Sequence, residues 1–286
     1  MISVMEPMRV SAEQRSTLRD NGFVVIHDVA PVDLCEAVIA AVCEFIGVDA
    51  NDPATWHRNR VEGHGIVPLH HHPALWAVRQ LPALHEVFTE LYGTGALLVS
   101  MDRASFKAPA SGWQDPVTMS RVHWDIDPRG KPRRRSYQGL IYLRDTSDEQ
   151  GAFCCVPDIF RNLETWLAEH PETFDTRPGA RRPIETDSMT QVGGPAGSMV
   201  IWDRCLPHSS GTNHGTLPRW VQYVTMDPAD ARRSPAERQE RARLFDQKRP
   251  PPWALRQNVP GQLDPEPGPV AKLTDLGRKL AGLDDW

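Results

Sequence analysis

Apolar and polar positions follow a helical period through much of residues 1–95. Residues 11–20 are polar with helical character, and the apolar run at 23–26 predicts a short strand directly after them. Residues 31–47 carry apolar side chains every three to four positions and end in glycine, which predicts a helix packed on a core. A second helix of this kind is predicted to end at residue 93. The first third of the chain is therefore predicted to be mostly helical.

From residue 96 the pattern changes to short β-rich segments separated by Gly, Pro, Ser and Asp. The predicted strands are 96–106, 117–126, 138–143, 152–156, 199–202 and 220–225. A helix at 159–168 interrupts them. Several short strands with turn signals between them favour a β-sandwich or a barrel.

The C-terminal part combines helices with a proline-rich stretch. Ser234, Pro235 and Glu237 supply an N-cap, a first-turn proline and a capping-box glutamate, which predict a helix reaching about residue 247. The Pro- and Gly-rich run after it predicts an extended linker to Pro269. Thr274 is expected to cap a last short helix.

The length of 286 residues fits one large domain, residues 1–286. We expect a mostly helical N-terminal part (1–95), a β-rich core (96–227) and a helical, Pro-rich C-terminal extension (228–286). The 32 basic and 37 acidic residues give a net charge of −5, which offers no electrostatic reason to expect nucleic-acid or membrane-surface binding. A small-molecule substrate is the expected partner, and the oligomeric state stays open.

Cysteine usage and hydropathy predict the compartment. The five cysteines include the adjacent Cys154 and Cys155 but no CxxC pair, as is typical of reduced thiols in the cytosol. The first residues lack a basic segment followed by a long apolar run, and no apolar stretch reaches the roughly 18 to 20 residues that span a bilayer. We therefore expect a soluble cytoplasmic protein.

The triplet His123-Trp124-Asp125, followed much later by His208, is the strongest chemical signal in the chain. In a strand, His123 and Asp125 point to the same face with Cα atoms about 7 Å apart, while Trp124 points away. A third ligand from a distant strand completes a facial triad of two histidines and one carboxylate. This triad leaves coordination positions open and is typical of non-haem Fe(II) oxygenases.

Arg219 suggests a co-substrate for this metal. His208 follows a predicted strand and Arg219 opens the next one, so two adjacent antiparallel strands are expected to place both on one cavity wall. The planar guanidinium of arginine binds a carboxylate through two parallel hydrogen bonds. A chelating 2-oxo acid with a second carboxylate is therefore the expected co-substrate.

With these residues in place, the sequence resembles the phytanoyl-CoA dioxygenase family of Fe(II)/2-oxoglutarate oxygenases between about residues 18 and 226. The matching segments, in the order of the family, are Asn21-Gly22-Phe23-Val24-Val25-Ile26, Phe106-Lys107-Ala108-Pro109, His123-Trp124-Asp125, Gly151-Ala152-Phe153 ahead of Val156-Pro157, and residues 208–213 followed by Arg219. The resemblance implies a double-stranded β-helix, which is a cupin-like jelly-roll barrel, with flanking helices.

The resemblance also implies roles for single residues. His123, Asp125 and His208 would bind Fe(II), and Arg219 would bind the distal carboxylate of 2-oxoglutarate. Lys107 and Ser210 match positions that contact the co-substrate in relatives; a solvated lysine and a turn serine are the alternatives. Dioxygen is the second co-substrate that the resemblance implies.

Two departures from the family leave the substrate open. Trp124 stands where relatives often have Gln, and Pro157-Asp158-Ile159-Phe160 replaces a usual Pro-Gly-Ser-His. Both lie near positions that shape the substrate pocket in relatives, so the substrate of a relative, including a CoA thioester, is not transferred here.

The predicted activity is a dioxygenase reaction that hydroxylates or otherwise oxidises a small organic molecule and releases succinate and CO2. Because halogenating relatives give up the carboxylate ligand to make room for halide, Asp125 favours hydroxylation. The alternative from another class is a non-catalytic protein on the same scaffold, which binds a metal or a small molecule without turnover.

Several further residues carry weaker signals. Asp127 either faces the site or opens a turn with Pro128. His70-His71-His72 are expected to lie in a surface loop or at a pocket rim, and Arg133-Arg134-Arg135 in a solvated loop or against an anionic substrate group. Cys154 and Cys155 are expected to be packing residues. Trp56, Trp76 and Trp113 either line an apolar pocket or fill the core.

Overall fold

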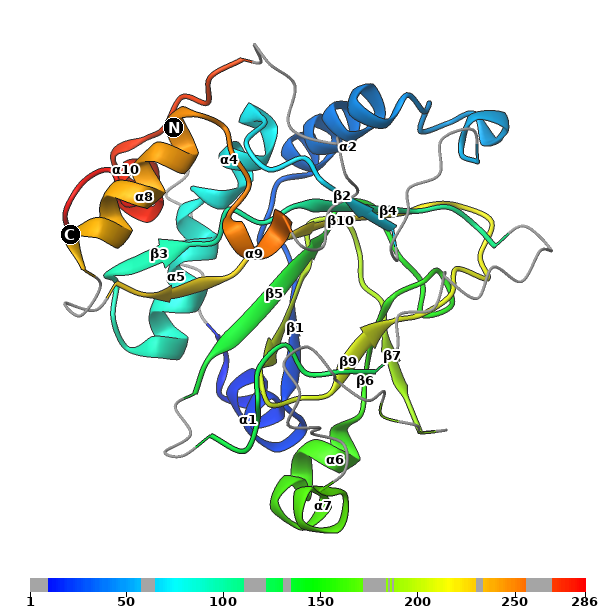
Figure 1. Ribbon diagram of the computed structural model, residues 1–286. Coiled ribbons are helices and arrows are strands. Elements are labelled where there is room, and N and C mark those ends of the chain that lie inside the picture. The colour runs from blue at the N-terminus through cyan, green and yellow to red at the C-terminus, as the bar shows by residue number, and fades with distance from the viewer. Residues whose placement is uncertain are drawn as a thin grey trace.

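The structure is a computed structural model of the full chain. It describes residues 10–57, 65–110, 122–130, 135–171, 184, 186, 188–229, 234–255 and 269–286. Within these ranges the protein combines helices with three antiparallel sheets (Figure 1).

The predicted N-terminal elements are confirmed. Helix α1 (Ala12–Asn21) begins with a capping box between Ser11 and Gln14, as an exposed polar helix requires. It ends at Gly22, whose φ of 80° lies in the left-handed region that favours glycine. Strand β1 (Phe23–Ile26) follows directly.

The next helices form the layer on which the sheet packs. They are α2 (Val32–Ile46), the 3-10 helix η1 (Pro53–Thr55), α4 (Pro73–Arg79) and α5 (Pro82–Tyr92). Helices α2 and α5 match the predictions. Helix α4 was not predicted; the side chain of His72 accepts a hydrogen bond from the backbone N–H of Ala74 and caps its first turn.

The strands form a six-stranded sheet of order β1-β8-β5-β10-β4-β2, a two-stranded sheet β11-β3 and a three-stranded sheet β7-β6-β9. Their bounds are β2 (Ile66–Val67), β3 (Leu97–Val99), β4 (Ala104–Lys107), β5 (Tyr137–Tyr142), β6 (Phe153–Cys155), β7 (Thr190–Val192), β8 (Met199–Asp203), β9 (His208–Ser210), β10 (Arg219–Tyr223) and β11 (Met226–Pro228). Most predicted strands are confirmed within a few residues.

Alternating side chains along the six-stranded sheet serve two different cores. In β8, Met199 and Ile201 join the cluster formed with helices α2, α4 and α5, while Val200 and Trp202 join a second cluster with Phe153 of β6. The second cluster lies between the six-stranded and the three-stranded sheet. One face of the large sheet is therefore covered by helices and the other by a second sheet.

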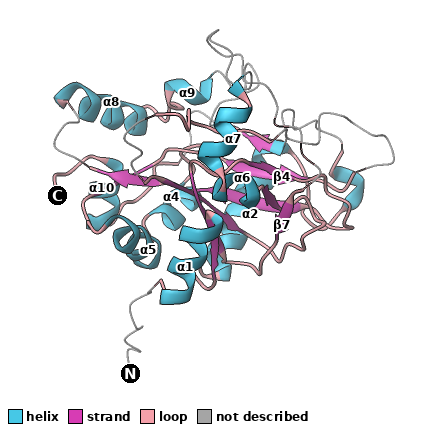
Figure 2. Cartoon of the chain, turned by 90° about the horizontal axis from the view of Figure 1, so that it is seen from below, coloured by secondary structure: helices cyan, strands magenta, loops and turns pink. Residues whose placement is uncertain are grey.

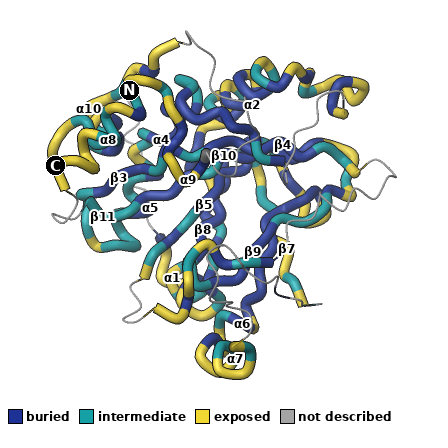
Figure 3. Tube along the Cα trace, in the orientation of Figure 1, coloured by how far each residue is buried: buried dark blue, intermediate teal, exposed yellow. Residues whose placement is uncertain are grey.

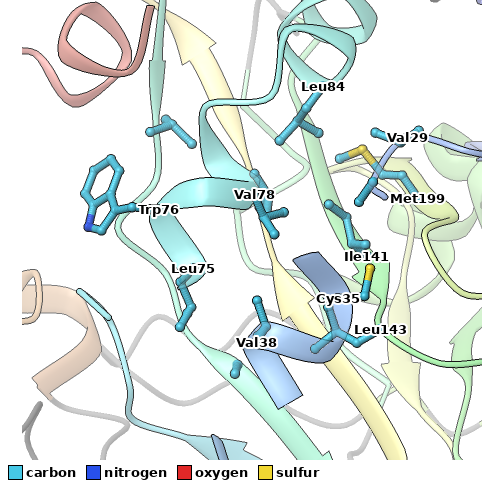
Figure 4. Packing of buried hydrophobic residues seen from close by; sticks show 14 of the residues in the cluster. Val29, Cys35, Val38, Leu75, Trp76, Val78, Leu84, Ile141, Leu143 and Met199 are labelled. Carbon is cyan, nitrogen blue, oxygen red and sulfur yellow. The ribbon is translucent and has the colours of Figure 1, made fainter. Parts of the chain in front are cut away.

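The pictures show the same layers. In Figure 4, Val38 of α2 and Val78 of α4 lie near Ile141 of β5 in the helix-facing core. Figure 2 shows α8 and α9 on one side of the strands and α1 and α5 on the other. In Figure 3 the strands β10, β4 and β8 are buried, whereas α7 at the edge is largely exposed.

Three predictions of secondary structure need correction. The single strand predicted at 96–106 is divided into β3 and β4, which belong to different sheets. The helix predicted at 159–168 is two short helices, α6 (Pro157–Arg161) and α7 (Leu163–Glu169), that meet at Asn162. Residues 122–126 contain one isolated β-bridge instead of a strand, and residues 117–121 lie outside the described ranges.

The expected jelly-roll barrel is confirmed only in part. Among the described residues, the six-stranded and three-stranded sheets pack face to face with flanking helices, and the strands do not close into a barrel. Among the described residues no helix is long and apolar enough to cross a bilayer.

The C-terminal extension packs on the helical layer. It contains α8 (Pro235–Asp246), α9 (Pro252–Leu255) and α10 (Asp275–Ala281), and α8 and α10 begin at the predicted caps Ser234 and Thr274. Phe245 of α8 stands edge-on to Trp76 of α4, with ring centroids 5.0 Å apart. The middle of the predicted linker, residues 256–268, lies outside the described ranges.

Candidate metal and co-substrate site

His123, Asp125 and His208 are brought together in space. Their potential ligand atoms all lie within 4.8 Å of one another. The Asp125 carboxylate lies between the two imidazoles, with Oδ1 3.5 Å from Nε2 of His123 and Oδ2 3.4 Å from Nε2 of His208. Two imidazole nitrogens and one carboxylate converging on one point are the donor set of a facial triad.

The backbone positions the two histidines through a single β-bridge. The N–H of His123 donates to the carbonyl of His208, and the N–H of His208 donates to the carbonyl of His123, both at 3.0 Å. Asp125 follows in a bend. The sequence argument, which placed His123 and Asp125 on one face of a strand, was therefore wrong about the local structure, although the residues do meet.

The side chain of His208 is oriented by its other ring nitrogen. Its Nδ1 lies 3.0 Å from the carbonyl of Leu206, and because a carbonyl only accepts, Nδ1 carries the proton. The ring stacks against Phe153 with centroids 5.9 Å apart and contacts Trp202. These contacts fix the ring with Nε2 facing Asp125, the orientation that a metal ligand requires.

Asp125 is held in its charged form. Burial raises the pKa of its carboxyl, but hydrogen bonds with His123 and His208 lower it much further, and the net result lies well below the usual range. Nε2 of Gln138, in β5, also donates to Oδ2 at 2.8 Å. Gln138 was not predicted as a site residue. The only feature of the sequence that pointed to it was its position at the start of a predicted strand.

Arg219 is fully buried on the inner face of the large sheet. Nη1 donates to the carbonyl of Gly151 at 2.9 Å, and Nη2 donates to Oγ of Ser105 at 2.5 Å. Within the described residues, Nε has no hydrogen-bond partner and no carboxylate forms an ion pair with this guanidinium. A buried cation without an acid partner is costly, so this arrangement favours an anionic ligand over a structural salt bridge.

Lys107 is the register partner of Arg219 and is also buried, with an exposed fraction of 5%. Its Nζ donates to Oγ of Ser210 at 2.9 Å and to the carbonyl of Gly211 at 2.7 Å. Burial, and then the positive charge of Arg219, lower the pKa of Lys107 to about 6. The alternative of a solvated surface lysine does not hold.

The depressed pKa of Lys107 predicts a pH-dependent stability. Between about pH 6 and pH 10 the unfolded chain binds the proton at this lysine and the folded chain does not, so the free energy of unfolding rises with pH. Lys107→Met is expected to remove this contribution, which is at most about 1.4 kcal/mol per pH unit. Urea denaturation of the ligand-free protein at pH 7 and pH 9 measures it.

The matched control for this experiment is Lys272→Met, which removes an exposed lysine. It is expected to keep the wild-type difference between the two pH values. An equal slope in Lys107→Met and wild type would mean that Lys107 is charged in the folded protein near neutral pH.

His208 and Arg219 do not lie on adjacent paired strands as expected. His208 is in β9 of the three-stranded sheet, and Arg219 is in β10 of the six-stranded sheet. The two sheets face each other across the cluster that includes Phe153 and Val221. The site therefore lies between the sheets, and Lys107 connects them through its bond to Ser210 of β9.

Ser105 was also missed by the sequence reading. It lies two residues before Lys107 on the same strand and pairs with Val221, two residues after Arg219. Side chains two apart on a strand share a face, so the alternation around Lys107 and Arg219 was a signal that could have found it.

Trp124 has a structural role beside the metal triad. It is 3% exposed and packs in a cluster with Ile159 and Leu163 of the two short helices. Its Nε1 donates to the carbonyl of Cys205 at 2.8 Å. The two departures from the family, at Trp124 and at residues 157–160, therefore lie in one hydrophobic cluster. This cluster packs α6 and α7 against the metal-binding segment.

The histidine tract is not at the surface. His70 and His71 are 0% and 2% exposed, so the expectation of surface or rim residues was wrong. Nδ1 of His70 lies 2.9 Å from the carbonyl of Met101, and Nε2 of His71 lies 2.9 Å from the carbonyl of Arg249. Burial lowers the pKa of His70 to about 3 and that of His71 to about 4, so both rings are neutral.

The remaining singled-out residues are placed as follows. Asp127 is exposed and opens a turn closed by Gly130, with its carboxylate paired to Arg129. Cys154 and Cys155 are buried packing residues, as predicted. Trp56 and Trp76 belong to the helix-facing core, Arg135 is exposed, and Trp113, Arg133 and Arg134 lie outside the described ranges.

Comparison with known proteins identifies the family to which this chain belongs. Residues 18–221 match the family described as phytanoyl-CoA dioxygenase (PhyH), and the chain belongs to it. A Dictyostelium discoideum protein named "Putative phytanoyl-CoA dioxygenase" is 24% identical in an alignment 258 positions long, and the match covers 72% of each chain. The resemblance drawn from the five sequence segments is confirmed.

Solved structures share the fold at low sequence identity. GlcNAc Inducible Gene 2 of Candida albicans is 13% identical and has a TM-score of 0.70, covering 99% of this chain and 78% of its own. HygX of Streptomyces hygroscopicus, solved with nickel and 2-oxoglutarate bound, is 16% identical with a TM-score of 0.55, covering 77% and 87%. At these identities the likeness shows the fold alone.

Proposed function

We propose that this protein is an Fe(II)/2-oxoglutarate-dependent dioxygenase that hydroxylates or otherwise oxidises a small organic molecule and releases succinate and CO2. The observation that carries the proposal is the pairing of two features in one space between the sheets. These are the converging ligand atoms of His123, Asp125 and His208, and the buried guanidinium of Arg219 without an acid partner among the described residues.

The donor set fits iron. His123 and His208 would hold the metal through imidazole nitrogens and Asp125 through its carboxylate, which its two histidine contacts keep ionised. When bound, Fe(II) together with 2-oxoglutarate supplies the dioxygen activation needed to attack a C–H bond. The protein's own contribution is to fix Nε2 of His208 through Leu206 and to orient the Asp125 carboxylate through Gln138.

The two buried basic side chains fit the co-substrate. Arg219 would bind the distal carboxylate of 2-oxoglutarate, with Lys107 and Ser210 beside it. An incoming dianion offsets the charge of a guanidinium that has no described acid partner, and a carboxylate also favours the protonated form of Lys107. The same donor set supports oxygen transfer over halide transfer, because halogenating relatives give up the carboxylate ligand that Asp125 supplies here.

We also propose the complete fold and the domain organisation. The facing sheets support a double-stranded β-helix as the complete fold, organised as a single domain over residues 1–286. A small-molecule substrate agrees with a site that lies between two sheets.

Anaerobic addition of Fe(II) and 2-oxoglutarate tests the proposal directly. We expect a visible charge-transfer band that requires both components, followed by succinate formation when air is admitted. A protein that shows neither the band nor succinate would be a non-catalytic binder on the same scaffold. Absorbance spectroscopy and chromatography of succinate are the two measurements.

A further inference from the structure

We propose that Gln138 of β5 is a positioning residue that sets the metal affinity of the triad through Asp125, and that the fold gives up stability to keep it there. The inference rests on the proposed function, in which Gln138 orients the Asp125 carboxylate. It adds two consequences of that contact. Metal binding depends strongly on the Gln138 amide, whereas the stability of the metal-free protein does not benefit from it.

Asp125 depends on side-chain contacts for its direction. The β-bridge that joins His123 to His208 does not include Asp125, which lies in a bend two residues after His123. Paired backbone hydrogen bonds hold the two histidine segments together, whereas a carboxylate can still turn about its own side-chain bonds. The orientation of this ligand is therefore set by the groups that contact its two oxygens.

Gln138 holds the carboxylate through one amide hydrogen bond. Its Nε2 donates to Oδ2 of Asp125 at 2.8 Å. Because an ionised carboxylate only accepts, this contact assigns the amide nitrogen to the side that faces Asp125. With Oδ2 held in this way, Oδ2 lies 3.4 Å from Nε2 of His208 and Oδ1 lies 3.5 Å from Nε2 of His123. The hydrogen bond thus keeps both oxygens directed at the two imidazoles.

The support comes from a well-anchored strand. Strand β5 pairs with β8 on one side and with β10 on the other. Leu140 and Tyr142, which follow Gln138 on the same face of β5, pack in the cluster between the two sheets. Trp202 of β8 lies opposite Gln138 and belongs to this cluster (Figure 3). A supporting group on such a strand is held more precisely than one on a loop.

The Gln138 amide is directed at Asp125 although a neighbour could pair with its other end. Oε1 of Gln138 and Nε1 of Trp202 are both buried, and neither has a hydrogen-bond partner among the described residues. They belong to opposite residues of one strand pair, whose Cβ atoms lie about 4.5 to 5.5 Å apart. An acceptor and a donor on neighbouring side chains therefore stay unpaired, and each such buried group destabilises the folded state.

Trp202 is likewise directed at a metal ligand. The centroid of its ring lies 5.1 Å from that of His208 and 4.6 Å from that of Phe153, which stacks on His208 in turn. Gln138 contacts Asp125 and Trp202 contacts His208, and the two side chains do not bond to each other. Unsatisfied groups at such a point are typical of a functional site at which function outweighs stability.

Gln138→Met tests the proposal, because it keeps the length of the side chain and removes both the amide donor and the unpaired acceptor. Metal affinity is measured with Co(II) alone, by titrating the metal-free full chain and recording visible absorbance. We expect Gln138→Met to bind Co(II) about 10- to 100-fold more weakly, which is the usual cost of losing a group that orients a ligand. The urea midpoint of the metal-free variant should equal or exceed that of wild type.

A double-mutant cycle checks that Gln138 acts through Asp125. In the Asp125→Asn background, Gln138→Met should cause a much smaller additional loss of Co(II) affinity, because the carboxylate that it orients is gone. Gln191→Met is the matched control, since Gln191 is an exposed glutamine of strand β7 in the facing sheet. It should leave the Co(II) affinity unchanged.

Equal Co(II) affinity in Gln138→Met and wild type would overturn the inference. A lower urea midpoint, or a Gln138→Met protein that does not fold, would also overturn it, because Gln138 would then be a structural residue. Fully additive losses in the cycle would mean that Gln138 does not act through Asp125. The anaerobic Fe(II)/2-oxoglutarate band of wild type separates the two proposals: its absence refutes the proposed function, whereas its presence with unaltered Co(II) binding in Gln138→Met refutes only this inference.

Discussion

Asp125→Ala is expected to abolish succinate formation while the protein stays folded. The carboxylate is the only acidic group in the triad and contacts both histidines, so its removal leaves two ligands for the metal. Loss of a group that merely supports a ligand already costs about 10- to 100-fold in metal affinity or activity, and loss of the ligand itself should exceed that. Succinate formation with saturating Fe(II) and 2-oxoglutarate measures the effect.

Asp127→Ala is the control for this substitution. Asp127 lies two residues further along, is exposed, and pairs with Arg129 across a turn. It should retain activity within about twofold, because an exposed pair of this kind contributes little to stability. Circular dichroism and a cooperative unfolding transition verify that Asp125→Ala is folded. Substantial succinate formation by folded Asp125→Ala would require a different set of metal ligands.

Arg219→Leu is expected to raise the 2-oxoglutarate concentration needed for half-maximal turnover by about 100-fold. Truncating one partner of a buried, hydrogen-bonded charge pair costs roughly 2 to 5 kcal/mol, and the co-substrate carboxylate would be the group left unpaired. Iron affinity should change far less, because Arg219 contacts Ser105 and Gly151 and none of the three metal ligands. Titration of both components separates the two affinities.

The matched control is Arg144→Leu, which removes an arginine that pairs with Glu36 and has a side chain 32% exposed. Its 2-oxoglutarate requirement should equal that of wild type. If Arg219→Leu also leaves the requirement unchanged, the distal carboxylate is bound by another group, and Lys107 becomes the first residue to substitute.

Local sequence signals predicted the helices well because their ends are fixed by neighbouring residues. Ser11 with Gln14 and Ser234 with Glu237 form the capping boxes that begin α1 and α8, and Gly22 ends α1 in a left-handed conformation. Each of these contacts spans three or four residues. Helix α4 was missed because its cap is an imidazole at His72, a residue type that sequence rules do not rank as a cap.

Long-range pairing could not be predicted in the same way. The segment 96–106 has continuous β character, yet β3 pairs with β11 and β4 pairs with β10 and β2. Its division is set by partners far away in the chain, which alternation along one segment does not encode. The same limit explains why His208 and Arg219, close in sequence, were expected on paired strands and instead lie on facing sheets.

The candidate site was predicted by residue type more successfully than by geometry. The triad residues carry chemistry that few other residues supply, so His123, Asp125 and His208 could be selected without knowing how the chain folds. Gln138 and Ser105 carry common side chains and gain their meaning only from the carboxylate or guanidinium that they contact. The position of His71 likewise depends on the C-terminal extension, because its ring contacts Phe245 and the carbonyl of Arg249 at the far end of the chain.

The β-bridge between His123 and His208 has a consequence for how metal exchange relates to folding. Two backbone hydrogen bonds hold these ligands together although a long stretch of chain separates them. Closing a loop of this length costs about 4 to 5 kcal/mol of chain entropy, and the folded backbone meets that cost before any ion arrives. Iron would therefore enter and leave a preassembled chelate, so that a chelator strips the metal from a protein that remains folded.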